Sequence, residues 1–259
     1  DALTTASDNV VMGRSALGSD TLGSRSVAIG RSALFAQNFT SATNSYNTAV
    51  GYGTGLSVTT GVQNTLIGGL AGDALTEPHK NVALGYGALT SDTKGASSTA
   101  LGHQALYNQN FTTATTTYNV AVGPNAGFAV TTGVQNTLIG GLAGDAITDA
   151  DFNIAIGTYA LTSDTLGSRS VAIGRSALAA QNFTSATNTY NVAVGHEAGQ
   201  AVTTGVQNTL IGSLAGDAIT TGGYNVAVGT LALTSQTTAS YNTALGRHAL
   251  YLNTTGAGL

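Results

Sequence analysis

The chain has 259 residues, with 35 Gly, 2 Pro, no Cys, no Trp and a formal net charge of -4. Only 8% of the residues are charged, so the chain lacks a basic face for phosphates or an anionic membrane, and we expect neither nucleic acid as a partner nor membrane insertion. Without Cys, disulfides and thiolate metal sites are excluded. The regular return of Val, Ile and Leu argues against disorder.

A short signature recurs along the whole chain: Asn or Ser, three mostly aliphatic residues, then Gly. The signatures follow one another in 17-residue steps, except that every fourth step is a 21-residue step, so the chain also has a 72-residue super-repeat. Fixed-period self-similarity is typical of a solenoid, in which each coil stacks on the next. The closing glycines are Gly13, Gly30, Gly51, Gly68, Gly85, Gly102, Gly123, Gly140, Gly157, Gly174, Gly195, Gly212, Gly229 and Gly246.

We therefore predict an all-β chain that forms a parallel β-solenoid of about 14 coils. Abundant Gly, Thr and Asn suit tight turns and disfavour helices. The array is expected to run over residues 1–259 as a single unit, with super-repeats at 9–80, 81–152 and 153–224 and a partial one at 225–259. Because the last coil is incomplete, we expect a segment of a longer fibre.

Each coil is predicted to begin with a three-residue strand, in which the first and third residues lie on one face and the middle residue on the other. The first and third residues are interpreted as interior ladders, stacked at ~4.8 Å along the solenoid to form the core. In chain order, these pairs are Val27/Ile29, Val82/Leu84, Val120/Val122, Ile154/Ile156, Val171/Ile173, Val192/Val194 and Val226/Val228.

Turns and a second strand are predicted to follow. The polar residue that opens each signature and the Gly that closes it suit corners. Three residues beyond the Gly stands Ala in nearly every coil, often followed by Leu, as in Ala33-Leu34. We interpret this pair as a second strand that turns back over the core, with Thr54 as the exception in the Ala column.

The middle residues of the strands form a stripe of Ala that Leu interrupts at every fourth coil. Two interpretations remain open: the stripe packs inside a monomeric coil, or it is a self-association face near a trimer axis. The proposed trimer-axis residues are Leu66, Ala121, Leu138, Ala193 and Leu210.

The three 21-residue coils, here called the long coils, carry four extra residues each, and we expect these insertions to protrude. An aromatic ring between polar side chains is suited to stacking on a sugar. The alternative is that the Phe residues turn inward as loop anchors. The candidate glycan-contact residues are Asn38, Phe39, Thr40, Asn110, Phe111, Thr112, Asn182, Phe183 and Thr184.

The remaining side chains do not suggest chemistry. Asp73, Asp145 and Asp217 each occur once per super-repeat, and Asp149 and Asp151 match no calcium-loop spacing. His79, His103, His196 and His248 lie in four separate coils, so we expect them not to stack into a metal cluster. We interpret the Tyr residues that precede the signatures as corner packing. We expect no enzymatic activity, no catalytic residue, no metal site and no cofactor.

The signatures resemble those of known fibre proteins. Ser26–Gly30, Asn153–Gly157 and Ser170–Gly174 are similar to YadA-like head repeats of trimeric autotransporter adhesins, although the coils of those heads are usually shorter than the coils of this chain. The run from Asn119, followed by Thr131-Thr132-Gly133 and Asn136–Gly140, is similar to repeats of phage tail-fibre proteins. The resemblance covers all fourteen coils. It implies a left-handed β-roll assembled as a homotrimer, with the small-residue face near the axis.

The expected function is that of a shaft or head segment of an extracellular fibre. It would lie on a virion surface as part of a tail fibre, display a receptor-binding tip and touch surface glycans through the long-coil loops. One alternative is a bacterial trimeric autotransporter adhesin on the cell surface. Another is a monomeric solenoid that binds ice or carbohydrate, which is disfavoured because Thr pairs such as Thr59-Thr60 return only once in four coils.

Overall fold

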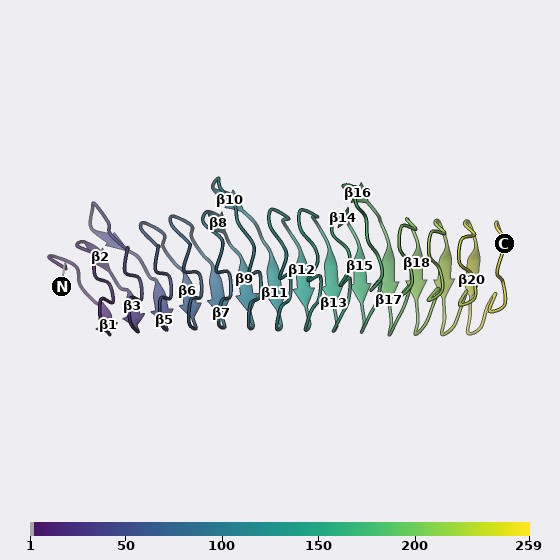
Figure 1. The fold of residues 1–259 in the computed structure, drawn as a ribbon, viewed down its shortest axis with the longest axis horizontal. Coiled ribbons are helices and arrows are strands. Elements are labelled where there is room, and N and C mark those ends of the chain that lie inside the picture. The colour runs from purple at the N-terminus through teal and green to yellow at the C-terminus, as the bar shows by residue number, and fades with distance from the viewer. Residues whose placement is uncertain (1–2) are drawn as a thin grey trace. The chain divides into compact units, whose positions relative to one another are not determined.

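The structure is a computed structural model that describes residues 3–259 (Figure 1). Every regular element in that range is a short β-strand, and the described residues contain no helix. The chain forms two compact units, Asp1–Thr132 and Gly133–Leu259. Each unit is a parallel β-solenoid, which confirms the predicted fold class.

In the first unit, seven strands lie in chain order along one parallel sheet. The register pairs Val10 with Val27 and Val27 with Thr48, so each strand lies beside the next turn of the coil. Two smaller parallel pairs stand apart from this sheet: β2 (Gly23–Ser24) with β4 (Thr43–Asn44), and β8 (Gly95–Ala96) with β10 (Thr115–Thr116). The main strands are β1 (Val10–Met12), β3 (Val27–Ile29), β5 (Thr48–Val50), β6 (Thr65–Ile67), β7 (Val82–Leu84), β9 (Thr99–Leu101) and β11 (Val120–Val122).

The second unit repeats this plan. Its seven main strands are again parallel, with Ile154 beside Val171 and Val171 beside Val192. One small pair joins β14 (Gly167–Ser168) to β16 (Thr187–Asn188). The main strands are β12 (Thr137–Ile139), β13 (Ile154–Ile156), β15 (Val171–Ile173), β17 (Val192–Val194), β18 (Thr209–Ile211), β19 (Val226–Val228) and β20 (Thr243–Leu245).

The core lies on the side of the strands opposite to the one predicted. The middle residue of each strand after β1 is buried, whereas the first and third residues are partly or fully exposed. The Val and Ile pairs interpreted as interior ladders therefore point outward. The proposed trimer-axis stripe lies inside the single chain, which confirms the alternative of packing within the coil: no side chain is exposed at Leu66, Ala121, Leu138, Ala193 or Leu210.

A size match between neighbouring coils explains why Leu replaces Ala at every fourth coil. Leu66 lies between two turns that carry Gly55 and Gly72, both at positive φ. A Cβ at Gly55 would lie 2.8 Å from Leu66 Cδ1, and one at Gly72 would lie 2.9 Å from Leu66 Cδ2. In most of the other coils, the turn position of Gly55 and Gly72 is occupied by Leu, as in Leu34 and Leu89, and the strand carries Ala. The interior of a coil is too narrow to hold a large side chain from both the turn and the strand.

The Ala-Leu segments are turns and not the second strand that the sequence predicted. Ala33 and Leu34 are buried, and Leu34 has a φ of 50°. Leu17, Leu89 and Leu106 show the same left-handed conformation, with φ between 49° and 56°. Such a conformation is unfavourable for a residue with a side chain, so burial of the Leu side chain is what offsets its cost.

Buried Asn side chains form the corners. Asn64 accepts the backbone N–H of Asn81 at 3.0 Å and donates through Nδ2 to the carbonyl of Pro78 at 3.0 Å. Its own backbone N–H donates to Asn47 Oδ1 at 2.9 Å. These contacts satisfy backbone groups that would otherwise be buried without partners. The predicted corners at the signature Asn are thus confirmed.

The closing glycines allow close stacking of the coils. Gly68 has a φ of 126°, and a Cβ at this position would lie 2.5 Å from the carbonyl oxygen of Gly85 in the next turn. Both the backbone conformation and the close approach exclude a side chain. The invariable Gly at the end of each signature follows from this geometry.

Candidate functional site: the outer strand face and the long-coil loops

The outer strand face is the surface made by the first and third residues of the main strands. Every third-position residue is a large apolar side chain, and every first-position residue is Val, Ile or Thr. Ile154 is 37% exposed, Leu84 47% and Leu245 78%. The third-position column is Met12, Ile29, Val50, Ile67, Leu84 and Leu101 with Val122 in the first unit, and Ile139, Ile156, Ile173, Val194, Ile211, Val228 and Leu245 in the second.

One edge of the outer strand face carries the residues that precede each signature. Tyr118 is 62% exposed and Tyr241 65%, so these rings stand at corners as predicted but are open to solvent. They stack along the coils: the Tyr224 and Tyr241 centroids lie 5.0 Å apart, and the Arg169 guanidinium carbon lies 4.8 Å from the Phe152 centroid. This edge therefore combines aromatic rings with Arg.

The opposite edge carries the residues that follow each closing Gly. Here the Arg31 guanidinium carbon lies 5.6 Å from the Tyr52 ring centroid. The rings of Tyr86 and His103 are stacked with centroids 5.8 Å apart. An apolar centre flanked by Tyr and Arg is the composition that marks protein interfaces.

The Phe residues of the long-coil loops are turned inward. Phe39, Phe111 and Phe183 are only 5–7% exposed. The prediction that these rings stack on a sugar is wrong, and the alternative of an inward loop anchor is confirmed. Each Phe ring is buried, and the backbone N–H of the same residue donates to a buried Asp. These two contacts hold the base of the loop in place.

The polar neighbours of these Phe residues remain at the surface. Asn38, Asn110 and Asn182 are exposed, and their Oδ1 atoms accept hydrogen bonds of 3.1–3.2 Å from Thr hydroxyls of the preceding coil. Thr40, Thr112 and Thr184 are also exposed. Figure 1 shows the loop that contains β10 projecting beyond the neighbouring coils of the first unit, as expected of an insertion.

A buried polar network holds each loop base. At the base of the second long-coil loop, Asp92 of the preceding coil accepts a hydrogen bond at Oδ2 from Gln109 Nε2 at 2.6 Å, and its Oδ1 accepts from the backbone N–H groups of Gly95 at 3.0 Å and Phe111 at 3.1 Å. Gln109 also donates to Ser98 Oγ at 2.8 Å and accepts from Asn119 Nδ2 at 2.8 Å. Asp20 with Gln37, and Asp164 with Gln181, repeat the arrangement.

The sequence analysis did not identify this network. Its signal was present, because Asp followed three residues later by Gly recurs in the coil before each long coil, as Asp20-Gly23, Asp92-Gly95 and Asp164-Gly167. Burial raises the pKa of the Asp92 carboxyl above its ordinary value, against the opposing effect of the hydrogen bond from Gln109.

Burial raises the pKa of Asp73 and Asp145 as well, with opposing hydrogen bonds from the hydroxyls of Thr90 and Thr162. Each of these two carboxylates therefore accepts a hydrogen bond from a Thr of the next coil, and the two lie in different super-repeats. Over residues 3–259, no three His, Asp or Glu side chains gather closely enough to hold a metal ion.

A Thr column runs along the coils, a few residues after the Ala of each turn. Thr59, Thr76 and Thr93 occupy the same offset in successive turns, so Thr recurs more often than the pairs counted in the sequence. Thr59 Oγ1 donates to the Thr76 carbonyl at 3.3 Å, and Thr76 Oγ1 to the Thr93 carbonyl at 2.9 Å. These hydroxyls are thus used within the stack.

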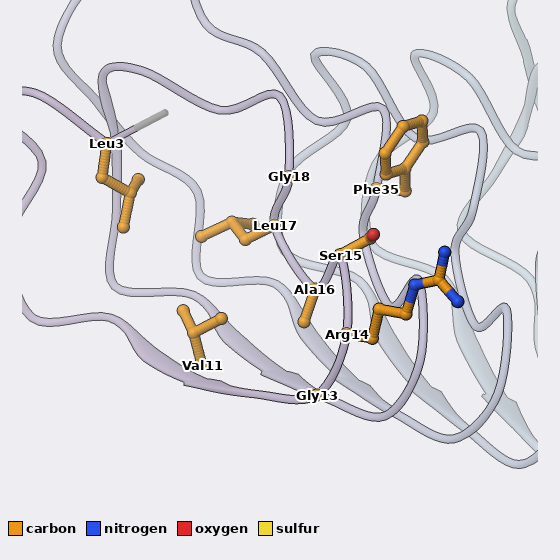
Figure 2. A pocket seen from close by; sticks show the side chains of 9 residues that line it. All are labelled: Leu3, Val11, Gly13, Arg14, Ser15, Ala16, Leu17, Gly18 and Phe35. Atoms are coloured by element: carbon orange, nitrogen blue, oxygen red, sulfur yellow. The ribbon is translucent and has the colours of Figure 1, made fainter. Parts of the chain in front are cut away.

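A hollow of 780 Å³ lies at the first turns of the first unit, where Leu3, Val11 and Leu17 point into a common space and Arg14 points away from them (Figure 2). No earlier turn covers this end among the described residues, so the hollow is an uncovered part of the apolar core. A groove of 270 Å³ lies beside β10 and is lined by Glu77, Pro78, His79, Lys94, Ala96 and Ala114–Thr116.

No helix among the described residues is long and apolar enough to cross a membrane. The comparisons with family models, with curated proteins and with solved structures give no match for this chain.

Proposed function

We propose that this chain is a structural segment of an extracellular fibre on a virion surface, similar to a phage tail fibre, in which three copies assemble side by side. In this proposal the 17-residue and 21-residue coils form left-handed β-rolls, and their arrangement returns with each 72-residue super-repeat. The segment holds a receptor-binding tip away from its base, and its long-coil loops face the glycans of the target surface.

The observation that supports the proposal is the outer strand face. A row of third-position residues such as Ile29, Ile67 and Ile173, all apolar, is exceptional for a surface that faces water throughout. Successive side chains of a strand point to opposite faces, so the first and third residues of each main strand point outward. A monomer would require polar residues at these positions. Three parallel copies arranged around a common axis would bring their apolar rows together and remove them from water.

A bacterial surface adhesin of the trimeric autotransporter type is the second candidate. The signatures Ser26–Gly30 and Ser170–Gly174 favour it. Such an adhesin would use the same outer strand face for self-association, and it differs from a tail fibre in what the rod is attached to.

Light scattering coupled to size exclusion tests the shared part of both candidates. The predicted mass of the dilute protein is three times the chain mass of 25.7 kDa. A folded monomer of 25.7 kDa would overturn the trimer and shift the function to a solenoid that works as a single chain.

A further inference from the structure

The groove beside the second long-coil loop combines charged and hydroxyl side chains in a small space. Its volume of 270 Å³ lies just below the ~300 Å³ at which pockets for drug-sized ligands begin. The space is therefore suited to one monosaccharide. Figure 1 shows β8 and β10 at the upper end of the coils, whereas β7 and β9 of the main sheet lie at the lower end.

The charged groups of the groove are not used within the protein. Lys94 is half-buried between small residues, with Ala96 and Ala114 in the same lining. Over the described part of the chain, neither Lys94 nor Glu77 forms an ion pair. An ammonium group on a partly desolvated floor favours a carboxylate partner more than an ammonium group in open water does.

The remaining polar groups suit hydroxyls of a sugar. His79 Nδ1 accepts the backbone N–H of Val62 at 3.1 Å, so the neutral ring carries its proton on Nε2 and can donate there. Thr116 adds an exposed hydroxyl, and Glu77 adds a carboxylate that accepts hydrogen bonds. Because Lys94 attracts an anionic group and Glu77 accepts hydrogen bonds but repels anions, the groove favours a ligand that has one carboxylate at Lys94 and hydroxyls at Glu77.

The charged lining of the groove does not recur along the chain. The position of Lys94 is Leu22 in the first super-repeat and Leu166 in the third, and the position of His79, at the end of the first super-repeat, is Asp151 at the end of the second. The cation and the imidazole are therefore particular to this loop and are not part of the repeating framework.

We propose that this groove binds a carboxylated monosaccharide, with Lys94 paired to its carboxylate and His79, Glu77 and Thr116 bonded to its hydroxyls. The inference rests on the proposed function, since it identifies the class of glycan that a long-coil loop contacts. Sialic acids and uronic acids share this chemistry.

The test is a titration by NMR of the whole chain with N-acetylneuraminic acid and, separately, with glucuronic acid. Galactose serves as the neutral sugar and acetate as the simple carboxylate. The variant Lys94→Leu copies the residue of the other two super-repeats, so the fold accepts it, and Lys80→Gln removes a nearby exposed cation that does not line the groove. We expect at least one acidic sugar to bind, and Lys94→Leu to weaken it at least tenfold while Lys80→Gln leaves it unchanged.

Three results would overturn the inference: neither acidic sugar binds, galactose or acetate binds as well as the acidic sugars, or Lys94→Leu has no effect. Which of the two acids binds identifies the source. The light-scattering mass of the same samples shows whether a failure concerns the groove or the proposed trimeric fibre. A trimer without binding refutes the groove alone, and a monomer that binds refutes the trimeric fibre alone.

Discussion

At the scale of single residues, the core depends on an exchange of Leu and Gly between neighbouring coils. Leu66 fills space that the turn residues leave open at Gly55 and Gly72, whereas Leu89 fills it from the turn and leaves room only for Ala83 or Ala100 in the strand. The interior of each coil thus holds a similar side-chain volume, whether the Leu comes from the strand or from the turn. Packing, and not a contact with a partner, thus decides which strand carries Leu.

This exchange predicts that Leu66→Ala and Gly72→Leu compensate each other. Leu66→Ala alone leaves a cavity and should cost about 2–5 kcal/mol. Gly72→Leu alone forces a side chain against both Leu75 and Leu66, since a Cβ there would lie 2.8 Å from Leu75 Cδ1 and 2.9 Å from Leu66 Cδ2, although Leu is accepted at a similar φ in Leu89. Leu66→Ala relieves the second of these contacts, so we expect the compensation to be partial. Urea unfolding of both single variants and the double variant measures the coupling. Additive losses would show that the two positions do not share space.

The buried carboxyl of Asp92 predicts an unusual response to acid. Its pKa is raised above the ordinary value of 3.8, so the folded state binds the proton more tightly than the unfolded state does. The stabilising contribution is complete below pH 3.8 and is lost as the pH rises through the folded pKa. Asp73 and Asp145 shift in the same direction.

We therefore expect the urea midpoint to rise as the pH is lowered from neutral toward ~4, the ordinary range of an Asp carboxyl, and the rise to shrink in Asp92→Asn. Asp8→Asn is the matched control, because Asp8 is exposed. A midpoint that falls on acidification in the native protein would show that burial of these carboxyls does not govern its pH dependence.

At the scale of elements, the long-coil loops are anchored insertions. The Phe111 ring is buried, its backbone N–H donates to Asp92, and β10 pairs with β8 of the preceding coil. The anchor lies at the base of the loop, while residues 112–114 at its tip are exposed. The loop is thus held at one end by the core and presents its tip to solvent.

Phe111→Ala should release this loop without unfolding the main sheet. Loss of the ring costs about 3–5 kcal/mol in a packed site, and we expect its effect to concentrate in local opening of residues 112–116. Amide hydrogen exchange measures this opening, with Val120–Val122 of β11 as the internal reference. Thr112→Ala, an exposed control, should change neither. Equal acceleration in loop and strand would show that the loop and the sheet unfold together.

The periodic elements were predictable from the sequence, and the direction of their side chains was not. Strands at 27–29 and 171–173 and corners at the signature Asn follow from spacing alone. A three-residue strand has the same alternation whichever face is buried, and Val27 and Ile29 are more apolar than Ala28, so hydrophobicity favoured the wrong face. Only the width of the coil, set by its turns, selects Ala28 for the interior.

The candidate site was predictable in part for a similar reason. The loops followed from their length, but the inward turn of Phe39 and Phe183 depends on Asp20 and Asp164 in the preceding coil, a contact that residue spacing alone does not reveal. The groove at Lys94 was not predicted, because it depends on side chains from three turns that meet only in the folded coil.

At the scale of the whole molecule, the account depends on which strand face is inside. Each unit buries Ala and Leu within its own coil and leaves the outer strand face of Val, Ile, Leu and Thr open. In the proposed fibre, three copies cover that face, with the Tyr and Arg columns at its edges. Substitution of adjacent residues within one strand should therefore have opposite consequences for folding and for assembly.

A pair of charge variants makes this prediction concrete. Leu66→Asp places a carboxylate in a fully buried position and should unfold the first unit, because an unpaired buried charge is very costly. Ile67→Asp places the same group on the outer strand face and should leave the fold intact. Circular dichroism distinguishes the two, and loss of structure in both would show that the outer face is part of the core of one chain.

The most direct measurement is the light-scattering mass of the triple variant Ile67→Glu, Ile139→Glu and Ile211→Glu, beside the unaltered protein. The account predicts three times 25.7 kDa for the unaltered protein and 25.7 kDa for a variant that keeps its β-strand signal. A variant that retains the mass of the unaltered protein would contradict assembly through the outer strand face.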